Sequence, residues 1–219
     1  MNDSARPNRY AFHLRYIGHD DTETLQDVLR TLGKAALQAE QRITDIAETQ
    51  DGDYIGEVVA EETMLIEDLL GCAFVAAQSY ITRIVSRLIW LHKRLERDGH
   101  CLTTTNGRKD GLISSCSDSV PGTEYTQIQV INAFANYSKH HDEWKPKWDD
   151  ETGQLPRRTI SVVQAVAASE NSSDNCRKGL TALGIHSAFD VYTMAKILAK
   201  WHANLTDAYK NELRRFSQS

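Results

Sequence analysis

The feature that most constrains this chain is one very long segment with helical periodicity, which extends from about Gly56 to Arg97. Its apolar residues recur at three- and four-residue spacing, so they share one side of an α-helix. The expected buried stripe consists of Val58, Leu65, Leu69, Phe74, Ile81, Ile84, Leu88 and Leu91. The segment therefore predicts a fold organised around a single long helix.

Two other segments have the same periodicity and predict further long helices. The first begins near Asp21 and Thr22, which form an N-cap signal, and continues to about Glu48. The second follows Ser187, and its expected stripe is Val191, Met194, Leu198, Trp201, Leu205, Ala208 and Tyr209. With only 12 Gly and 4 Pro among 219 residues, the composition also favours helices.

One segment between the helices, residues 99–122, has no helical period and is rich in Thr, Ser, Asn, Asp and Gly. Within it, Asn106-Gly107 is a dipeptide that favours a tight turn between strands. Cys101–Thr105 and Gly111–Ser115 flank this turn. We expect this segment to form either a polar loop or a small hairpin.

Shorter helices are expected at Arg157–Ala168 and at Asn175–Leu183, the latter stopped by Gly184. The fold class predicted from these segments is all-α, a helical bundle of three long helices plus shorter ones. Residues 22–219 are expected to form this bundle as a single domain. Residues 1–21 are expected to form an N-terminal arm that packs on it.

Charge and composition exclude several classes of protein. The formal charge of −5 argues against a protein coated for non-specific nucleic-acid binding, although a local basic patch is still able to bind RNA. No apolar run is long enough to span a membrane, and the N-terminus lacks the apolar core of a secretory signal. The cysteines are scattered without a Cys-x-x-Cys pair, which suits reduced thiols. We expect a cytoplasmic protein with no membrane contact.

Two groups of side chains are candidate metal ligands by residue type. His100, Cys101 and Cys116 match no standard zinc spacing. Glu57, Glu61 and Glu62 could join Glu143 or a histidine in a bundle core, but the Glu-x-x-His pairing of such sites is missing. We therefore predict no metal and no cofactor.

The charges of the longest helix are ordered along the chain. Its first half contains Glu57, Glu61, Glu62, Glu67 and Asp68, and its second half contains Arg83, Arg87, Lys93, Arg94 and Arg97. This order complements the helix macrodipole, which is one structural explanation. Arg83, Arg87 and Arg94 also share a face with Trp90, and such a face is able to hold a phosphate or a base.

The stretch Ile131–Trp144 has the composition most typical of a functional site. A helix is expected from Thr123-Glu124 to Trp144, just before Pro146. At about 100° per residue, Asn132, Asn136, Lys139 and Glu143 lie within about 60° of one another, with His140 at the edge. The opposite side contains Val130, Phe134, Tyr137, His141 and Trp144. A solvated helix face is the structural alternative.

Within this stretch, Ala135-Asn-Tyr-Ser-Lys-His140 resembles the Arg-Asn-x-x-x-His motif of HEPN domains. These are helical bundles of toxin–antitoxin, abortive-infection and other antiviral systems. In that family the motif Arg and His meet their copies across a dimer and cleave RNA without a metal. The resemblance implies Asn136 as the polar motif residue and His140 as the motif histidine. The motif arginine is replaced here by Ala135.

In-line attack by a ribose 2′-OH needs a proton acceptor and a cation for the developing phosphorane charge. His140 is the candidate acceptor, and Lys139, Arg83 or Arg87 is the candidate cation. The candidate catalytic residues are thus His140, Asn136, Lys139 and Glu143, and the candidate substrate-binding residues are Asn132, Arg83, Arg87 and Arg94.

Two functions are consistent with these features. The first is a metal-independent ribonuclease of a defence or toxin–antitoxin module, with its site at a homodimer interface. The second is a non-catalytic helical interaction protein, such as an immunity protein, an antitoxin or a scaffold, that binds a protein partner in a defence complex. The clustered polar residues favour the first function, whereas the acidic charge and the missing arginine favour the second.

Overall fold

The computed structural model describes Tyr10, Leu14, Trp148 and residues 22–49, 55–103, 107–144, 157–170 and 172–216. Within these ranges the fold is all-α and contains no strand. The three long helices are α2 (Glu23–Thr49), α3 (Ile55–Arg97) and α8 (Thr193–Phe216). The shorter helices are α4 (Lys109–Ser114), α5 (Gln127–His140), α6 (Arg157–Ala165) and α7 (Asn175–Ala182), with 3-10 turns η2 (His141–Trp144) and η3 (Ala188–Tyr192). The predicted fold class is confirmed.

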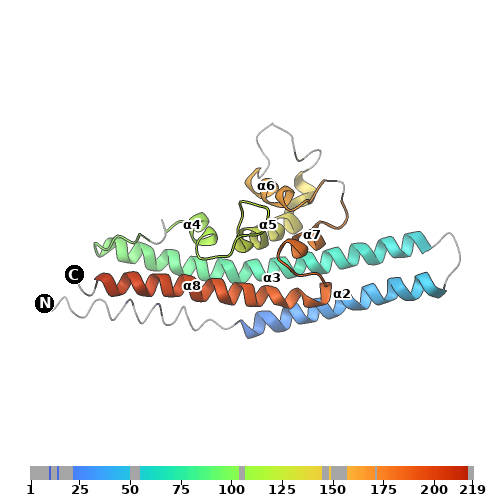
Figure 1. The fold of residues 1–219 in the computed structure, drawn as a ribbon, viewed down its shortest axis with the longest axis horizontal. Coiled ribbons are helices and arrows are strands. Elements are labelled where there is room, and N and C mark those ends of the chain that lie inside the picture. Colours follow the sequence, from blue (N-terminus) through green and yellow to red (C-terminus); the bar gives the residue numbers. More distant parts are fainter. Residues whose placement is uncertain are drawn as a thin grey trace.

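The helix α3 runs through the whole length of the molecule and organises the other elements around it (Figure 1). The helix α2 and the first half of α3 form an antiparallel hairpin, and α8 lies along the second half of α3. The short helices α4 to α7 lie on the other side of α3 in this view. The long and the short helices are therefore arranged around one 43-residue helix.

The apolar stripe of α3 is buried largely where the periodicity places it. Phe74, Ile81, Ile84, Leu88 and Leu91 are each fully buried. The prediction that Leu65 is buried is wrong, because 41% of this residue is exposed. Ile66 and Leu70 are buried instead. In the first half of α3 the buried side is therefore turned by about one residue relative to the predicted stripe.

The segment 99–122 contains a helix and no hairpin among its described residues. Gly111 and Ser114, expected in a strand, belong to α4, and the neighbouring Leu112 and Ile113 are both buried. Because a strand points successive side chains to opposite faces, two adjacent buried side chains suit a helical turn better. An isolated bridge joins Ser119 to Thr126, and Asn106 lies outside the described residues.

Two helix starts differ from their predicted positions because local caps decide them. The helix α5 begins after Thr126 instead of Thr123, since Thr126 and Gln129 form a reciprocal capping box. Its last predicted turn tightens into η2 at His141. The hydroxyl of Ser187 caps η3 by accepting a hydrogen bond from the backbone N–H of Phe189 at 3.2 Å. The helix α8 then continues from η3, whereas Ser187 was expected to cap α8 itself.

The apolar stripe of α8 follows its prediction closely. Met194, Leu198, Trp201, Leu205 and Tyr209 are almost completely buried. Of the predicted N-terminal arm, the structure describes Tyr10 and Leu14, both buried in the core, and the rest of that prediction lies outside the described residues.

None of the described helices combines the length and the hydropathy needed to cross a membrane.

Candidate functional site

The polar stripe of α5 is held against α3 by a single buried glutamine. Ile128, Ile131 and Phe134 anchor the apolar side of α5 in the core, which turns Asn132 and Asn136 toward Gln78 of α3. Gln78 is only 8% exposed. Its amide donates to the side-chain oxygens of Asn132 at 3.0 Å and Asn136 at 2.9 Å, and to the Asn132 carbonyl at 3.2 Å.

Lys139 completes this group from the next turn of α5. Its ammonium donates to Oε1 of Gln78 at 2.6 Å. Gln78, Asn132, Asn136 and Lys139 are together called the amide cluster. Both polar atoms of the glutamine are thus engaged, and three of the predicted site residues are hydrogen-bonded to it.

His140 and Glu143 lie outside the amide cluster. Nδ1 of His140 and Oε1 of Glu143 are 3.1 Å apart, and the two side chains are 47% and 72% exposed. The hydrogen bonds of the Asn136 side chain and of the Lys139 ammonium run to Gln78 and not to the imidazole. The structure therefore divides the predicted catalytic group into an interhelical cluster and a solvent-exposed pair.

The three arginines expected to bind substrate lie on a different side of α3. At about 100° per residue, Arg83, Arg87 and Arg94 are turned by about 140–180° from Gln78, which faces α5. The guanidinium of Arg83 lies 5.2 Å from the ring centre of Tyr80, and that of Arg94 lies 6.0 Å from the ring centre of Trp90. These arginines are not brought to the polar stripe of α5.

Ala135, at the position of the motif arginine, is completely buried. Its neighbours on the inner side of α5 are Ile131 and Phe134, which are also fully buried. A guanidinium at this position would be enclosed in the apolar core, where an unpaired charge is strongly destabilising. The packing of this helix in the core therefore explains why alanine, and not arginine, occupies this position.

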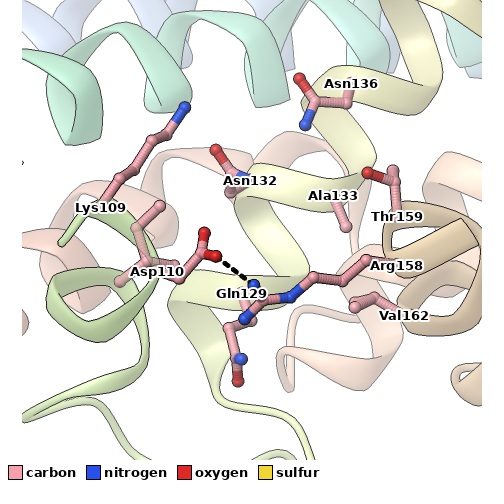
Figure 2. Close-up of a pocket in the computed structure, with 10 residues that line it drawn as sticks. Lys109, Asp110, Gln129, Asn132, Ala133, Asn136, Arg158, Thr159 and Val162 are labelled. Atoms are coloured by element: carbon pink, nitrogen blue, oxygen red, sulfur yellow. Dashed lines mark hydrogen bonds and ion pairs between the residues drawn. The ribbon is translucent and has the colours of Figure 1, made fainter. Parts of the chain in front are cut away.

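A cavity of about 200 Å³ lies beside the amide cluster, between α4, α5 and α6 (Figure 2). Asn132 and Asn136 line it together with residues that were not predicted from the sequence, namely Lys109, Asp110, Gln129, Arg158 and Thr159. Arg158 of α6 forms an ion pair with Asp110 of α4 across the opening. The amides and cations suit binding of a polar group, but no histidine or cysteine is among the described residues that line this cavity.

The two groups of side chains that are candidate metal ligands by residue type form no metal site in the described part of the chain. Among the described residues, no group of three or more His, Cys, Asp or Glu side chains has the proximity needed to hold a metal ion.

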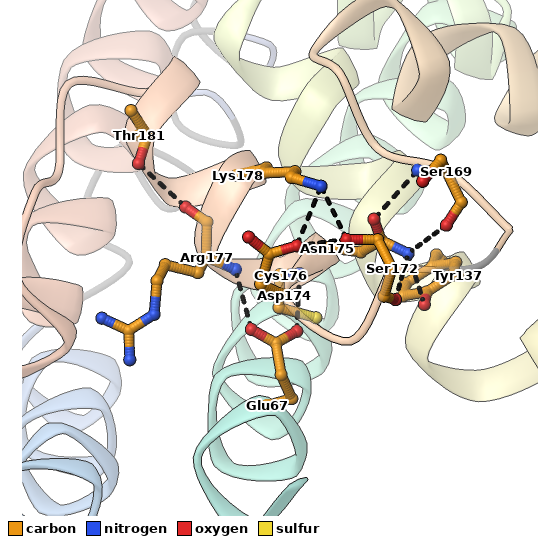
Figure 3. Close-up of polar contacts among 10 residues, drawn as sticks. All are labelled: Glu67, Tyr137, Ser169, Ser172, Asp174, Asn175, Cys176, Arg177, Lys178 and Thr181. Carbon is orange, nitrogen blue, oxygen red and sulfur yellow. Dashed lines mark hydrogen bonds and ion pairs between the residues drawn. The ribbon is translucent and has the colours of Figure 1, made fainter. Parts of the chain in front are cut away.

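A second polar network fixes α7 against α3 and α5 (Figure 3). Glu67 of α3 accepts hydrogen bonds from the backbone N–H groups of Cys176 at 2.8 Å and Arg177 at 3.2 Å. Asn175 donates to the hydroxyl of Tyr137 at 2.9 Å and to the carbonyl of Ser169 at 2.8 Å. Glu67 thus caps the start of α7 from a different helix, a role that no local sequence signal indicates.

The pKa of Glu67 provides a test of its burial beneath α7. Burial raises its pKa above the ordinary value of 4.5, against the opposing effect of the N–H groups of Cys176 and Arg177. A glutamate with a raised folded-state pKa binds its proton more tightly when folded. Its contribution to stability is therefore largest at low pH and falls as pH rises past about 4.5.

We expect the free energy of unfolding of the wild type, minus that of Glu67→Gln, to decrease as pH rises from about 4 to about 7. The glutamine does not titrate, so the other ionisable groups cancel in this difference. Urea unfolding at a series of pH values measures it. A difference that is constant or grows with pH would show that Glu67 is not buried as described.

Comparison with known proteins adds no relative, since the chain matches no protein-family model, no curated protein and no solved structure.

Proposed function

We propose that this chain is a non-catalytic helical interaction protein that binds a protein partner. The observation that carries the proposal is the amide cluster, in which Asn132, Asn136 and Lys139 hydrogen-bond to Gln78 and join α5 to α3. Three of the candidate catalytic and substrate-binding residues thus have a structural role. The burial of Ala135 supports the same conclusion.

Among the residues that the structure describes, none of the cations considered for RNA cleavage is directed to the exposed pair of His140 and Glu143. A ribonuclease without a metal needs a cation beside its base to stabilise the phosphorane charge. Lys139 is adjacent in sequence, but its ammonium is directed to Gln78, 2.6 Å from Oε1. The arginines of α3 lie on another side of that helix. Neither supplies a cation at the imidazole.

The resemblance to HEPN domains supplies the biological setting of the proposal. Under it, the chain is a degenerate member that kept the helical framework and acts by binding in a defence or toxin–antitoxin module. The ribonuclease remains the second candidate, and one observation favours it: His140 is 47% exposed and therefore accessible to a phosphodiester.

An RNA cleavage assay with chelator present distinguishes the two functions. We expect the wild type and His140→Ala to behave alike and to leave RNA intact, with an unchanged melting temperature because the imidazole is half exposed. His141→Ala is the matched control for a contaminating nuclease, which would act equally in all three samples. Chelator-resistant cleavage that falls about 100-fold in His140→Ala alone would replace this proposal with the ribonuclease.

A further inference from the structure

One side of α3 is exposed along almost the whole helix. At about 100° per residue, Glu57, Cys72, Ser79 and Arg97 all point within about 60° of one common direction from the helix axis. Cys72, Ser79 and Arg83 are exposed, and so are two large apolar residues, Leu65 (41%) and Trp90 (45%). This side is called the outer face of α3. It is turned away from Gln78, which faces α5.

The outer face has an ordered charge distribution. Glu57, Glu61 and Asp68 occupy its first half, whereas Arg83, Arg94 and Arg97 occupy its second half. The helix macrodipole acts only within the first and last turns, so it does not account for Asp68 and Arg83, which lie near the middle. Within the described part of the chain, Glu57, Glu61 and Asp68 form no ion pair. Their carboxylates are available to a partner.

We infer that the outer face binds a second copy of this chain, with the two α3 helices antiparallel about a two-fold axis between Val75 and Ala76. In that register Asp68 faces Arg83 of the second copy, and Glu57 faces Arg94. Two-fold symmetry forms each pair twice. A parallel arrangement would instead place like charges opposite each other, so the charge order selects the antiparallel one.

The centre of the outer face allows two helices to approach closely. Around the proposed axis lie Cys72, Ala76 and Ser79, whose side chains are small. Leu65 and Trp90 lie further out, where a second copy would cover them. The face therefore combines small residues at the crossing with exposed apolar residues and complementary charges on both sides of it.

This inference deepens the proposed function by naming its partner as a second copy. It differs from a HEPN-type dimer, in which the stretch around His140 would meet its own copy. The proposed function and this inference can be refuted independently of each other. The RNA assay tests the role of His140, whereas sedimentation and cross-linking measure only self-association through α3.

Charge reversal at one pair gives the sharpest test. We expect the wild type to sediment as a dimer at about ten micromolar, while Asp68→Arg and Arg83→Asp each weaken self-association by about 30-fold, because two attractive pairs become repulsive. An equimolar mixture of the two variants should dimerise again, since both pairs of the mixed dimer are then of opposite charge. Circular dichroism of each variant controls for folding.

Disulfide cross-linking tests the register independently, with Cys101→Ser and Cys116→Ser as the background. In the proposed dimer, Cys72 lies opposite Ser79 of the other copy, whereas the two Cys72 residues are about 10 Å apart along the helices. Ser79→Cys should therefore form a covalent dimer under mild oxidation, and the background alone should not.

Four outcomes would overturn the inference. They are a monomeric wild type, a dimer that both charge reversals leave intact, a mixture of variants that stays monomeric, and cross-linking of Cys72 to its own copy. RNA binding by a monomer, abolished by Arg83→Asp, would assign the basic half of the face to nucleic acid instead.

Discussion

Gly33→Ala is expected to lower the free energy of unfolding by about 2 kcal/mol, although alanine is the better helix former by about 1 kcal/mol. Gly33 lies in α2 where η3 crosses it. A Cβ added there would be 2.5 Å from the carbonyl oxygen of Phe189 and 3.1 Å from a methyl group of Val191. Because the nearest atom belongs to the backbone, η3 itself has to move, and with it the start of α8.

Gly56→Ala is the matched control for this prediction. Gly56 lies at the start of α3, and an added Cβ would meet no atom of the described residues within 4 Å. We therefore expect the control to be neutral or stabilising by up to about 1 kcal/mol. Urea unfolding measures both variants. Equal stabilisation by the two substitutions would mean that η3 does not pack closely on Gly33.

Gln78→Met should destabilise the protein by about 2 kcal/mol, since it removes the centre of the amide cluster while keeping a side chain of similar length. The side-chain oxygens of Asn132 and Asn136 lose their donor, and the ammonium of Lys139 loses its acceptor. Leaving polar groups unsatisfied in a partly buried interface costs about 1–3 kcal/mol.

Ser79→Ala controls for changes in helix propensity at the neighbouring position of α3. Ser79 is exposed, and its hydroxyl donates to the carbonyl of Val75, one turn earlier, at 3.0 Å. We expect a change within about 0.5 kcal/mol. If Gln78→Met were as mild as this control, the hydrogen bonds of the cluster would contribute little to the packing of α5 on α3.

The long helices could be predicted from the sequence because their periodicity is local and repeated over many turns. The helical spacing of Asn132, Asn136 and Lys139 likewise placed them correctly on one face of α5. It could not identify what that face meets, since Gln78 is 54 positions from Asn132 along the chain. A lone glutamine among Ala73, Phe74 and Ala77 was the available signal, because it interrupts a buried stretch.

The errors have a common physical origin in tertiary contacts. Helical spacing placed Arg83 and Arg87 on one face of α3 but could not show that this face is turned away from α5. The hairpin expected around Asn106-Gly107 was argued from turn chemistry alone, whereas the burial of both Leu112 and Ile113 favours a helix. The cap that Glu67 supplies to α7 depends on two helices distant in sequence.

The central claim is that the polar stripe of α5 is a structural junction with α3. A double-mutant cycle between Gln78 and Lys139 tests it most directly, with Gln78→Met, Lys139→Met and the double variant compared by urea unfolding. We predict a coupling free energy of about 1 kcal/mol. Each single variant already loses the hydrogen bond from the ammonium to Oε1, so the double variant is less destabilised than the sum of the two single variants. Zero coupling, with Lys139→Met as stable as the wild type, would contradict the claim.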